Sequence, residues 1–131
     1  MKPPACYVAL VTAPDKKTAR ALAQAVLQTR LAACVNLLPA VESHYWWNGK
    51  LETGLEILMI FKTTQRRLPA LKRVILEKHP YETAEFIAFK ITSGSETYLE
   101  WIVDSISDPA PSQRVLSAGI PKGDKNLSKS R

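Results

Sequence analysis

The chain has few cysteines. Only Cys6 and Cys34 occur among 131 residues, and they do not form a CxxC pair. This count gives no support for a disulfide scaffold or a zinc ribbon. Both cysteines lie in apolar runs, "ACYVALV" and "LAACVNLL", where a thiol usually behaves as a small buried hydrophobic group. We therefore expect two reduced core thiols and a reducing, cytoplasmic location.

The familiar catalytic and phosphate-binding motifs are also missing. The sequence contains no GxxxxGK[ST], GxGxxG, HExxH or GxSxG pattern. Phosphate binding by a glycine-rich loop, zinc-dependent proteolysis and serine hydrolysis therefore lack support. We expect a protein that is not an enzyme and has no catalytic residues. If it were an enzyme, Glu85 and His79 would be the only nearby candidates for an acid–base pair.

Long apolar runs are absent as well. The run near the N-terminus, from Ala5 to Val11, has seven residues and is followed by Pro14 and Asp15. It is too short to span a membrane and is a poor signal peptide. We expect no membrane insertion, and we interpret the run as the first strand.

The net charge of +6 is unevenly distributed along the chain. Residues 108–131 hold five basic and two acidic side chains, which leaves 13 basic and 10 acidic side chains in residues 1–107. The C-terminal segment is rich in Pro, Ser, Gly and Lys and shows no periodicity, so we expect a disordered basic tail. Residues 1–107 are predicted to form one mildly basic domain.

The first half of the chain predicts a strand and then a helix. "CYVALVTA" is a continuous β-prone run, as in a strand buried on both faces,. The following "PDKKTARALAQAVLQTR" places Pro14 and Asp15 in first-turn positions. Its apolar residues recur at helical spacing, at Ala19, Leu22, Ala23 and Val26,.

A later segment, "TTQRRLPALKRVILEKHPYE", predicts a second helix. Pro69 is tolerated only near a helix start, so this helix should begin near Gln65 or Arg66. Pro80 forces His79 into an extended conformation and should end it. "AEFIAFKIT" then predicts a strand, and "SGSETYLEWIVDSI" predicts a helix that opens at Ser93 with a capping box.

Between the first two helices, Asn48 and Gly49 lie between two β-prone arms, the strongest short hairpin signal,. The turn pairs Trp47 with Lys50, and Pro39 must then lie at a bulge or on an unpaired edge. Each arm has about fourteen residues and spans on the order of 45 Å. A domain of this size is only about 35 Å across, so we expect copies of the chain to cover one another's hairpins in a closed ring.

The predicted order is β-α-β-β-α-β-α. Its first six elements form the ferredoxin-like βαββαβ arrangement, an α+β sandwich with an antiparallel sheet, here followed by a C-terminal helix. RNA-recognition modules share this order but carry a basic and aromatic signature on the third strand. Here that strand reads "LEILMIFK", so we expect no nucleic-acid partner.

Two histidines and the tryptophans are candidate functional residues. His79 either complements the dipole at a helix end or faces a cleft at a subunit junction. His44 faces solvent or a subunit seam, with metal ligation as the minor alternative. The tryptophans are more often packing than recognition residues, and we expect Tyr45, Trp46 and Trp47 to lie at the oligomer interface.

Several motifs together resemble one family. "VTAPD", "RLAACVNLLP", "YWWNGKLE", "ILMIFKT", "KHPYETAE" and "YLEWI", in this order and spacing, are similar to the CutA family of divalent-cation tolerance proteins over about residues 7 to 104. The resemblance implies a ferredoxin-like subunit in a tight homotrimer and a role linked to copper and other divalent cations. "ACVNLLP" resembles animal members, some of which are associated with anchoring acetylcholinesterase at membranes.

The resemblance also implies a weak metal site. Bacterial relatives are described as holding copper through a cysteine just before the "TAP" motif, with help from a histidine and a glutamate. His79 and Glu56 resemble the latter two, but Val11 occupies the cysteine position. Loss of the thiolate removes the ligand that favours Cu(I), so no cofactor is required and only weak copper or other divalent-cation binding is expected.

A second implication is a small-molecule site. Trimers of this fold resemble the PII signalling proteins, which bind small ligands between subunits. The residues that we expect in such an inter-subunit cleft are Lys62, His79, Tyr81, Glu85 and Trp101,. A binding or regulatory module with weak metal affinity is the leading interpretation, with a PII-like sensor or an animal-type scaffold as the alternatives.

Overall fold

The computed structural model describes residues 4–107. The elements are β1 (Cys6–Ala13), α1 (Lys16–Gln28), β2 (Cys34–Trp47), β3 (Lys50–Thr64), α2 (Leu68–Lys78), β4 (Ile87–Lys90) and α3 (Glu96–Ile106). The predicted order is confirmed. The predicted disordered tail lies outside the described residues.

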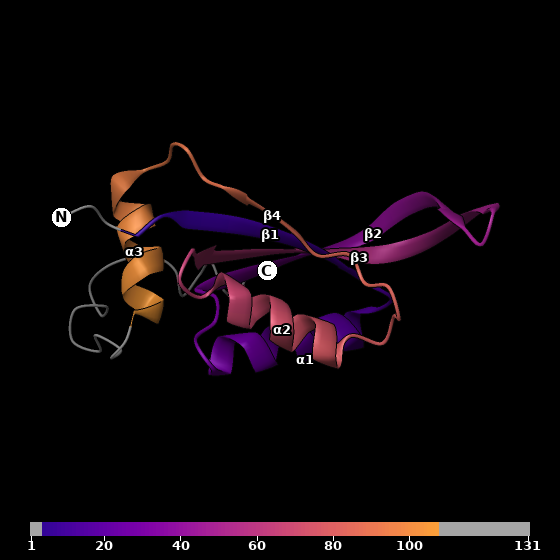
Figure 1. Ribbon diagram of the computed structural model, residues 1–131, viewed down its shortest axis with the longest axis horizontal. Coiled ribbons are helices and arrows are strands. Elements are labelled where there is room, and N and C mark those ends of the chain that lie inside the picture. The colour runs from indigo at the N-terminus through magenta and orange to yellow at the C-terminus, as the bar shows by residue number, and fades with distance from the viewer. Residues whose placement is uncertain (1–3, 108–131) are drawn as a thin grey trace.

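The four strands form one antiparallel sheet in the order β2-β3-β1-β4. Helices α1 and α2 lie side by side along one face of it (Figure 1). Residues of β1 and β3 that point toward these helices, such as Val11, Met59 and Phe61, have no exposed surface. The opposite face, called here the open face, is only partly covered in a single chain.

The sheet is longer than its helical layer. Strands β2 and β3 continue as a hairpin beyond the helices, while α3 lies at the opposite end of the molecule (Figure 1). Trp47 pairs with Lys50 as predicted. Asn48 and Gly49 both have positive φ, at 50° and 77°, as a two-residue type I′ turn requires. The register shifts between Leu38 and Val41, which confirms the bulge expected at Pro39.

Helix α2 begins at Leu68 rather than near Gln65 or Arg66. The earlier residues are held by other bonds, because the Gln65 N–H donates to the Ala5 carbonyl and the Arg67 N–H donates to the Thr64 carbonyl. Its end is as predicted, since His79 is the extended C-cap residue.

Two helix caps differ from the prediction. Asp15 is the N-cap of α1 rather than a first-turn residue, and its carboxylate accepts a bond from the Thr18 N–H, which lowers the pKa of Asp15. Helix α3 is capped by Ser95, whose hydroxyl accepts from the Tyr98 N–H, and not by Ser93. Because α3 begins at Glu96, Ser95 is the residue directly before the helix. From there its side chain reaches the N–H three residues ahead, as an N-cap side chain does.

Two burial predictions and one strand length also need correction. Strand β1 is central in the sheet but is fully buried on only one of its faces. The predicted strand over "AEFIAFKIT" pairs only from Ile87 to Lys90. Cys6 is buried, which raises the pKa of its thiol, but Cys34 is only half-buried on the open face. Among the described helices, none is both long and apolar enough to cross a membrane.

Candidate functional site

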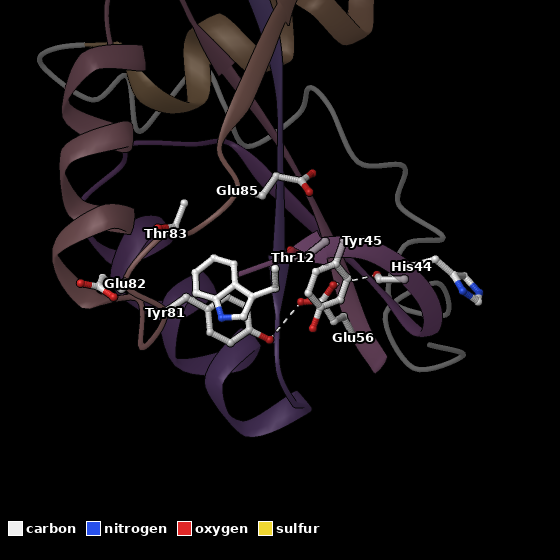
Figure 2. Close-up of a pocket in the computed structure, with 10 residues that line it drawn as sticks. Thr12, His44, Tyr45, Glu56, Tyr81, Glu82, Thr83 and Glu85 are labelled. Atoms are coloured by element: carbon white, nitrogen blue, oxygen red, sulfur yellow. Dashed lines mark hydrogen bonds between the residues drawn. The ribbon is translucent and has the colours of Figure 1, made fainter. Parts of the chain in front are cut away.

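A cavity of about 590 Å³ lies where the hairpin leaves the body of the sheet. Its walls come from the end of β1, the hairpin arms and the loop between α2 and β4, as Figure 2 shows. The lining residues are Thr12, Ser43, His44, Tyr45, Trp47, Glu56, Tyr81, Glu82, Thr83 and Glu85. Among the described residues, this lining includes three carboxylates, the imidazole of His44 and the aromatic side chains of Tyr45, Trp47 and Tyr81, but no lysine or arginine.

Glu56 is held in position by two hydroxyl groups. The Ser43 Oγ donates to one of its carboxylate oxygens at 2.7 Å, and the Tyr81 hydroxyl donates to the other at 3.0 Å (Figure 2). Burial and the neighbouring carboxylate raise the pKa of Tyr81 to about 12. The phenol therefore remains a protonated hydrogen-bond donor at neutral pH, which fixes both side chains on the cavity wall.

Glu85 adds a second negative charge on this wall. Partial burial and the charge of Glu56 both raise the pKa of Glu85. None of the described residues that line the cavity is a lysine or an arginine, so no such side chain on this wall neutralises Glu56 or Glu85. Two carboxylates in one partly desolvated place repel each other. A positive charge bound between them would relieve this repulsion.

His79 lies behind the cavity wall and supports it. It is buried, its Nε2 is 2.7 Å from the Thr12 carbonyl oxygen, and its Nδ1 accepts the Tyr81 N–H at 3.1 Å. A carbonyl only accepts and an amide N–H only donates, so these partners assign a neutral ring with its proton on Nε2. Both nitrogens of His79 are thus occupied, and its ring packs 4.8 Å from that of Tyr81.

The three aromatic residues predicted for the oligomer interface lie on two faces of the hairpin. Side chains of a strand alternate between its faces, so Tyr45 and Trp47 share the face of Glu56 and line the cavity. Trp46 points to the other face, opposite its partner Leu51, where both are about 70% exposed.

His44 contacts polar partners on the hairpin. Its Nε2 is 2.7 Å from a Glu42 carboxylate oxygen, and its Nδ1 is 3.3 Å from the Thr53 hydroxyl. In Figure 2 its ring is turned away from the hydrogen bond between Tyr81 and Glu56. The predicted exposure of His44 is confirmed.

The predicted cleft residues fall into two groups in a single chain. Tyr81 and Glu85 line the cavity, and His79 lies behind it. Lys62 lies six residues beyond Glu56 along β3, about 20 Å away, and Trp101 belongs to α3. A cleft that unites all five residues would need a second subunit, and it stays a prediction.

A second polar cluster surrounds Lys62. The Lys62 ammonium group contacts the side-chain oxygen of Asn36 and lies 4.0 Å from the Cys34 sulfur. The Tyr98 hydroxyl bonds to the same thiol, and the Tyr98 ring stacks on Trp101 at 5.5 Å. Burial together with Cys34 raises the pKa of Tyr98 to about 12.

Sequence reasoning did not identify Thr12, Ser43, Glu82 and Thr83 as cavity residues. The hairpin register places Ser43 on the same face as Glu56, and this signal was available from the Asn48–Gly49 turn. The other three residues reach the cavity only through the packing of β1 and the loop after α2. No local pattern in the sequence reports that packing.

The described residues fit a tightly held metal poorly. Residues 4–107 contain no group of three or more His, Cys, Asp or Glu side chains arranged to hold a metal ion. His79 offers no free nitrogen, and Val11 offers no ligand atom. The donors that remain are carboxylate and hydroxyl oxygens at Glu56 and Glu85, which suit a weakly held hard cation better than Cu(I).

Comparison with known proteins agrees with this fold. A family model described as CutA1 divalent ion tolerance protein matches residues 7–105. The human protein CutA is 44% identical over 109 residues, which cover 81% of this chain and 61% of the human protein. The divalent-cation tolerance protein CutA of Citrobacter koseri is 45% identical over 103 residues, covering 79% of this chain and 90% of that protein.

Solved structures show the same similarity. CutA1 from rice superimposes with a TM-score of 0.78 at 40% identity, covering 81% of this chain and 97% of that one. CutA1 from Thermus thermophilus gives a TM-score of 0.72 at 39% identity, covering 74% and 94%. The names of relatives point to different compartments, chloroplastic for a rice protein and periplasmic for one from Archaeoglobus fulgidus, so the cytoplasmic location stays a prediction. On its match to the family model and to these relatives, the chain belongs to the CutA1 divalent ion tolerance family.

Proposed function

We propose that this chain forms a homotrimer that acts in divalent-cation tolerance as a binding module rather than an enzyme, and that it holds a divalent cation weakly at Glu56 and Glu85. The observation that carries this proposal is that Glu85 and Glu56 line one wall whose described residues include no lysine or arginine, where the charge of Glu56 helps to raise the pKa of Glu85. A bound cation relieves the repulsion between the two carboxylates.

Binding at this place is expected to be weak. Two carboxylates supply only part of the six to eight oxygen ligands that a large hard cation takes, so water or a neighbouring subunit completes the shell. His79 contributes a nitrogen only if its bond to the Tyr81 N–H opens. We expect dissociation constants on the order of 10⁻⁴ M or weaker.

The trimer part of the proposal rests on exposed apolar surface at the hairpin. Trp46, Leu51 and Leu55 are each about 70% exposed in a single chain, and they share one face of the hairpin. An exposed apolar patch of this kind usually marks an interaction site. Copies arranged around a closed ring would cover it without leaving a free end.

Calorimetric titration with Mn²⁺, Zn²⁺ and Cu²⁺, with the oligomer size measured by light scattering, tests this function. Glu56→Gln and Glu85→Gln should each weaken binding severalfold, while Glu100→Gln on the exposed surface of α3 should not. His79→Ala separates two roles of the ring: an equal affinity in this variant assigns His79 to support of the wall. Absence of binding in the wild type, or equal affinity in all three glutamine variants, would refute the metal role.

A second candidate is a small-molecule sensor. The cavity volume of about 590 Å³ lies within the range of roughly 300–1,000 Å³ that is common for small-ligand sites. Its mixed aromatic and polar lining is also typical of such sites. In this case a ligand, and not a metal, would raise the melting temperature of the protein.

A further inference from the structure

The cavity combines two kinds of side chain that attract the same kind of ligand. Glu56 and Glu85 bring negative charge, while Tyr45, Trp47 and Tyr81 bring aromatic rings. The face of an aromatic ring carries partial negative charge and attracts a cation, with indole the strongest of the three side-chain types. No lysine or arginine is among the described residues that line this cavity, so no such side chain competes with a cationic ligand for those groups.

We propose that this cavity binds an organic ammonium ion, with the alkyl groups against the rings of Tyr45, Trp47 and Tyr81 and the positive charge near Glu56 and Glu85. This inference rests on the proposed role of the cavity as a binding site, and it names the class of ligand. A bare divalent cation prefers oxygen donors and retains water, so the Trp47 ring would not contribute to its binding. An organic ammonium ion uses the carboxylates and the rings together.

The wall is already organised for such a ligand. Both oxygens of Glu56 are fixed, by Ser43 and by Tyr81. Tyr81 is held at two further points: its backbone N–H donates to the His79 ring, and its own ring packs on that imidazole. Groups that are held in place before binding lose little conformational entropy when the ligand arrives.

The volume of the cavity agrees with a ligand larger than a metal ion. About 590 Å³ accommodates an amine with several carbon atoms, as small-ligand sites of this size do. In Figure 2, Glu82 is turned away from the pair formed by Tyr81 and Glu56. Glu82 also lines the cavity, and the carboxylates assigned to the ligand are Glu56 and Glu85.

The hairpin supplies a matched control for the role of Trp47. Trp46 is its neighbour in sequence and has the same side chain, but alternation along β2 places it on the opposite face of the hairpin,. Trp46 is also absent from the cavity lining. Trp46→Leu and Trp47→Leu thus make the same chemical change on the two faces.

The test is a titration of the full chain with tetramethylammonium, and with tert-butanol as an uncharged probe of similar shape, followed by the NMR signals of the tryptophan indoles. Saturable binding is expected for tetramethylammonium only. Trp47→Leu should weaken it about tenfold, within the range of a desolvated cation–π contact, and Glu56→Gln should weaken it by a similar factor. Trp46→Leu should leave the affinity unchanged.

Three results would overturn the inference: equal binding of the two probes, no binding of tetramethylammonium, or equal losses in the two tryptophan variants. The second of these is also expected if a side chain of a neighbouring copy fills the cavity. Light scattering on each variant shows whether a loss comes from altered assembly. If Trp47→Leu alters the oligomer size, it is replaced by Tyr81→Leu, for which the same tenfold loss is required.

A parallel titration with Mn²⁺ separates this inference from the proposed metal role. Mn²⁺ should bind Trp47→Leu as tightly as the wild type, because the ring is not a metal ligand. If tetramethylammonium binds and Mn²⁺ does not, the metal role fails and the ammonium site stands. If Mn²⁺ binds and tetramethylammonium does not, the ammonium site fails.

Discussion

The same two strands, β2 and β3, pass through two different environments. Under helices α1 and α2, Met59 and Phe61 of β3 have no exposed surface, whereas Leu51 and Leu55 nearer the hairpin turn are about 70% exposed. Figure 1 shows the reason, since the helical layer ends before the hairpin does. The covered part of the sheet obtains its burial from helices of its own chain, whereas no other part of residues 4–107 covers Leu51 and Leu55 of the hairpin.

The cavity lies at the boundary between these two regions. Thr12 ends the covered part of the sheet, Tyr45 and Trp47 belong to the hairpin, and Tyr81 and Glu85 come from the loop beside the boundary. Variants of the two regions should therefore behave differently in stability, in assembly and in pH response.

The largest effect is expected for Phe61→Ala in the covered part of the sheet. Loss of a fully buried phenylalanine leaves a cavity and should lower the free energy of unfolding by about 3–5 kcal/mol. Leu51→Ala on the hairpin should cost about 1–2 kcal/mol and act mainly on assembly. Urea unfolding and light scattering measure both. If Leu51→Ala changes neither stability nor oligomer size, the hairpin is not covered by another copy.

A smaller effect is expected for His79→Ala at the boundary. The substitution removes the hydrogen-bond partner of the Thr12 carbonyl and of the Tyr81 N–H, both of which are bonded to the imidazole in the folded chain. The loss should be about 1–3 kcal/mol of unfolding free energy, measured by urea unfolding. Lys78→Ala, at the exposed preceding residue, is the control. Equal losses in the two variants would show that the His79 bonds contribute nothing.

The smallest effect is a pH-dependent gain in stability from Glu85→Gln. The folded protein raises the pKa of Glu85 above its ordinary value of 4.5, so the folded state binds that proton more tightly than the unfolded state. The stability from this proton is fully present below pH 4.5 and is lost as the pH rises through the folded pKa. Glu85→Gln should therefore raise the melting temperature at neutral pH and leave it unchanged below pH 4.5.

Glu82→Gln is the control for that measurement, because Glu82 is turned away from Glu56 (Figure 2). It should leave the difference between neutral and acid pH as in the wild type. A gain from Glu85→Gln that is equally large below pH 4.5 would mean that charge repulsion is not its cause.

Local patterns in the sequence predicted most of the fold. The Asn48–Gly49 turn and the alternation of its arms were enough to derive the hairpin register from the turn as far as Val41, because a two-residue turn fixes each pair up to the bulge,. Boundaries were less accurate, as at the starts of α2 and α3. There the choice depended on which hydroxyl or carbonyl group lay within reach after folding.

The candidate site was predicted only in part. Glu56, Tyr81 and Glu85 were each named from the sequence, with Glu56 as a metal ligand and the other two as cleft residues, and the structure brings them to one wall. The sequence did not group them in that way, because the loop after α2 has no periodicity from which its path can be derived.

The sequence by itself determined the order of the elements, the hairpin register and the membership of the chain in its family, because these depend on neighbours along the chain and on motifs at fixed spacing. Only the tertiary structure decided that the histidine before Pro80 uses both ring nitrogens on backbone groups, and that Trp46 and Trp47 face different surroundings. The physical reason is that hydrogen-bond partners and burial come from residues far apart in sequence, which meet only when the sheet, its helices and the loop beside them have packed together.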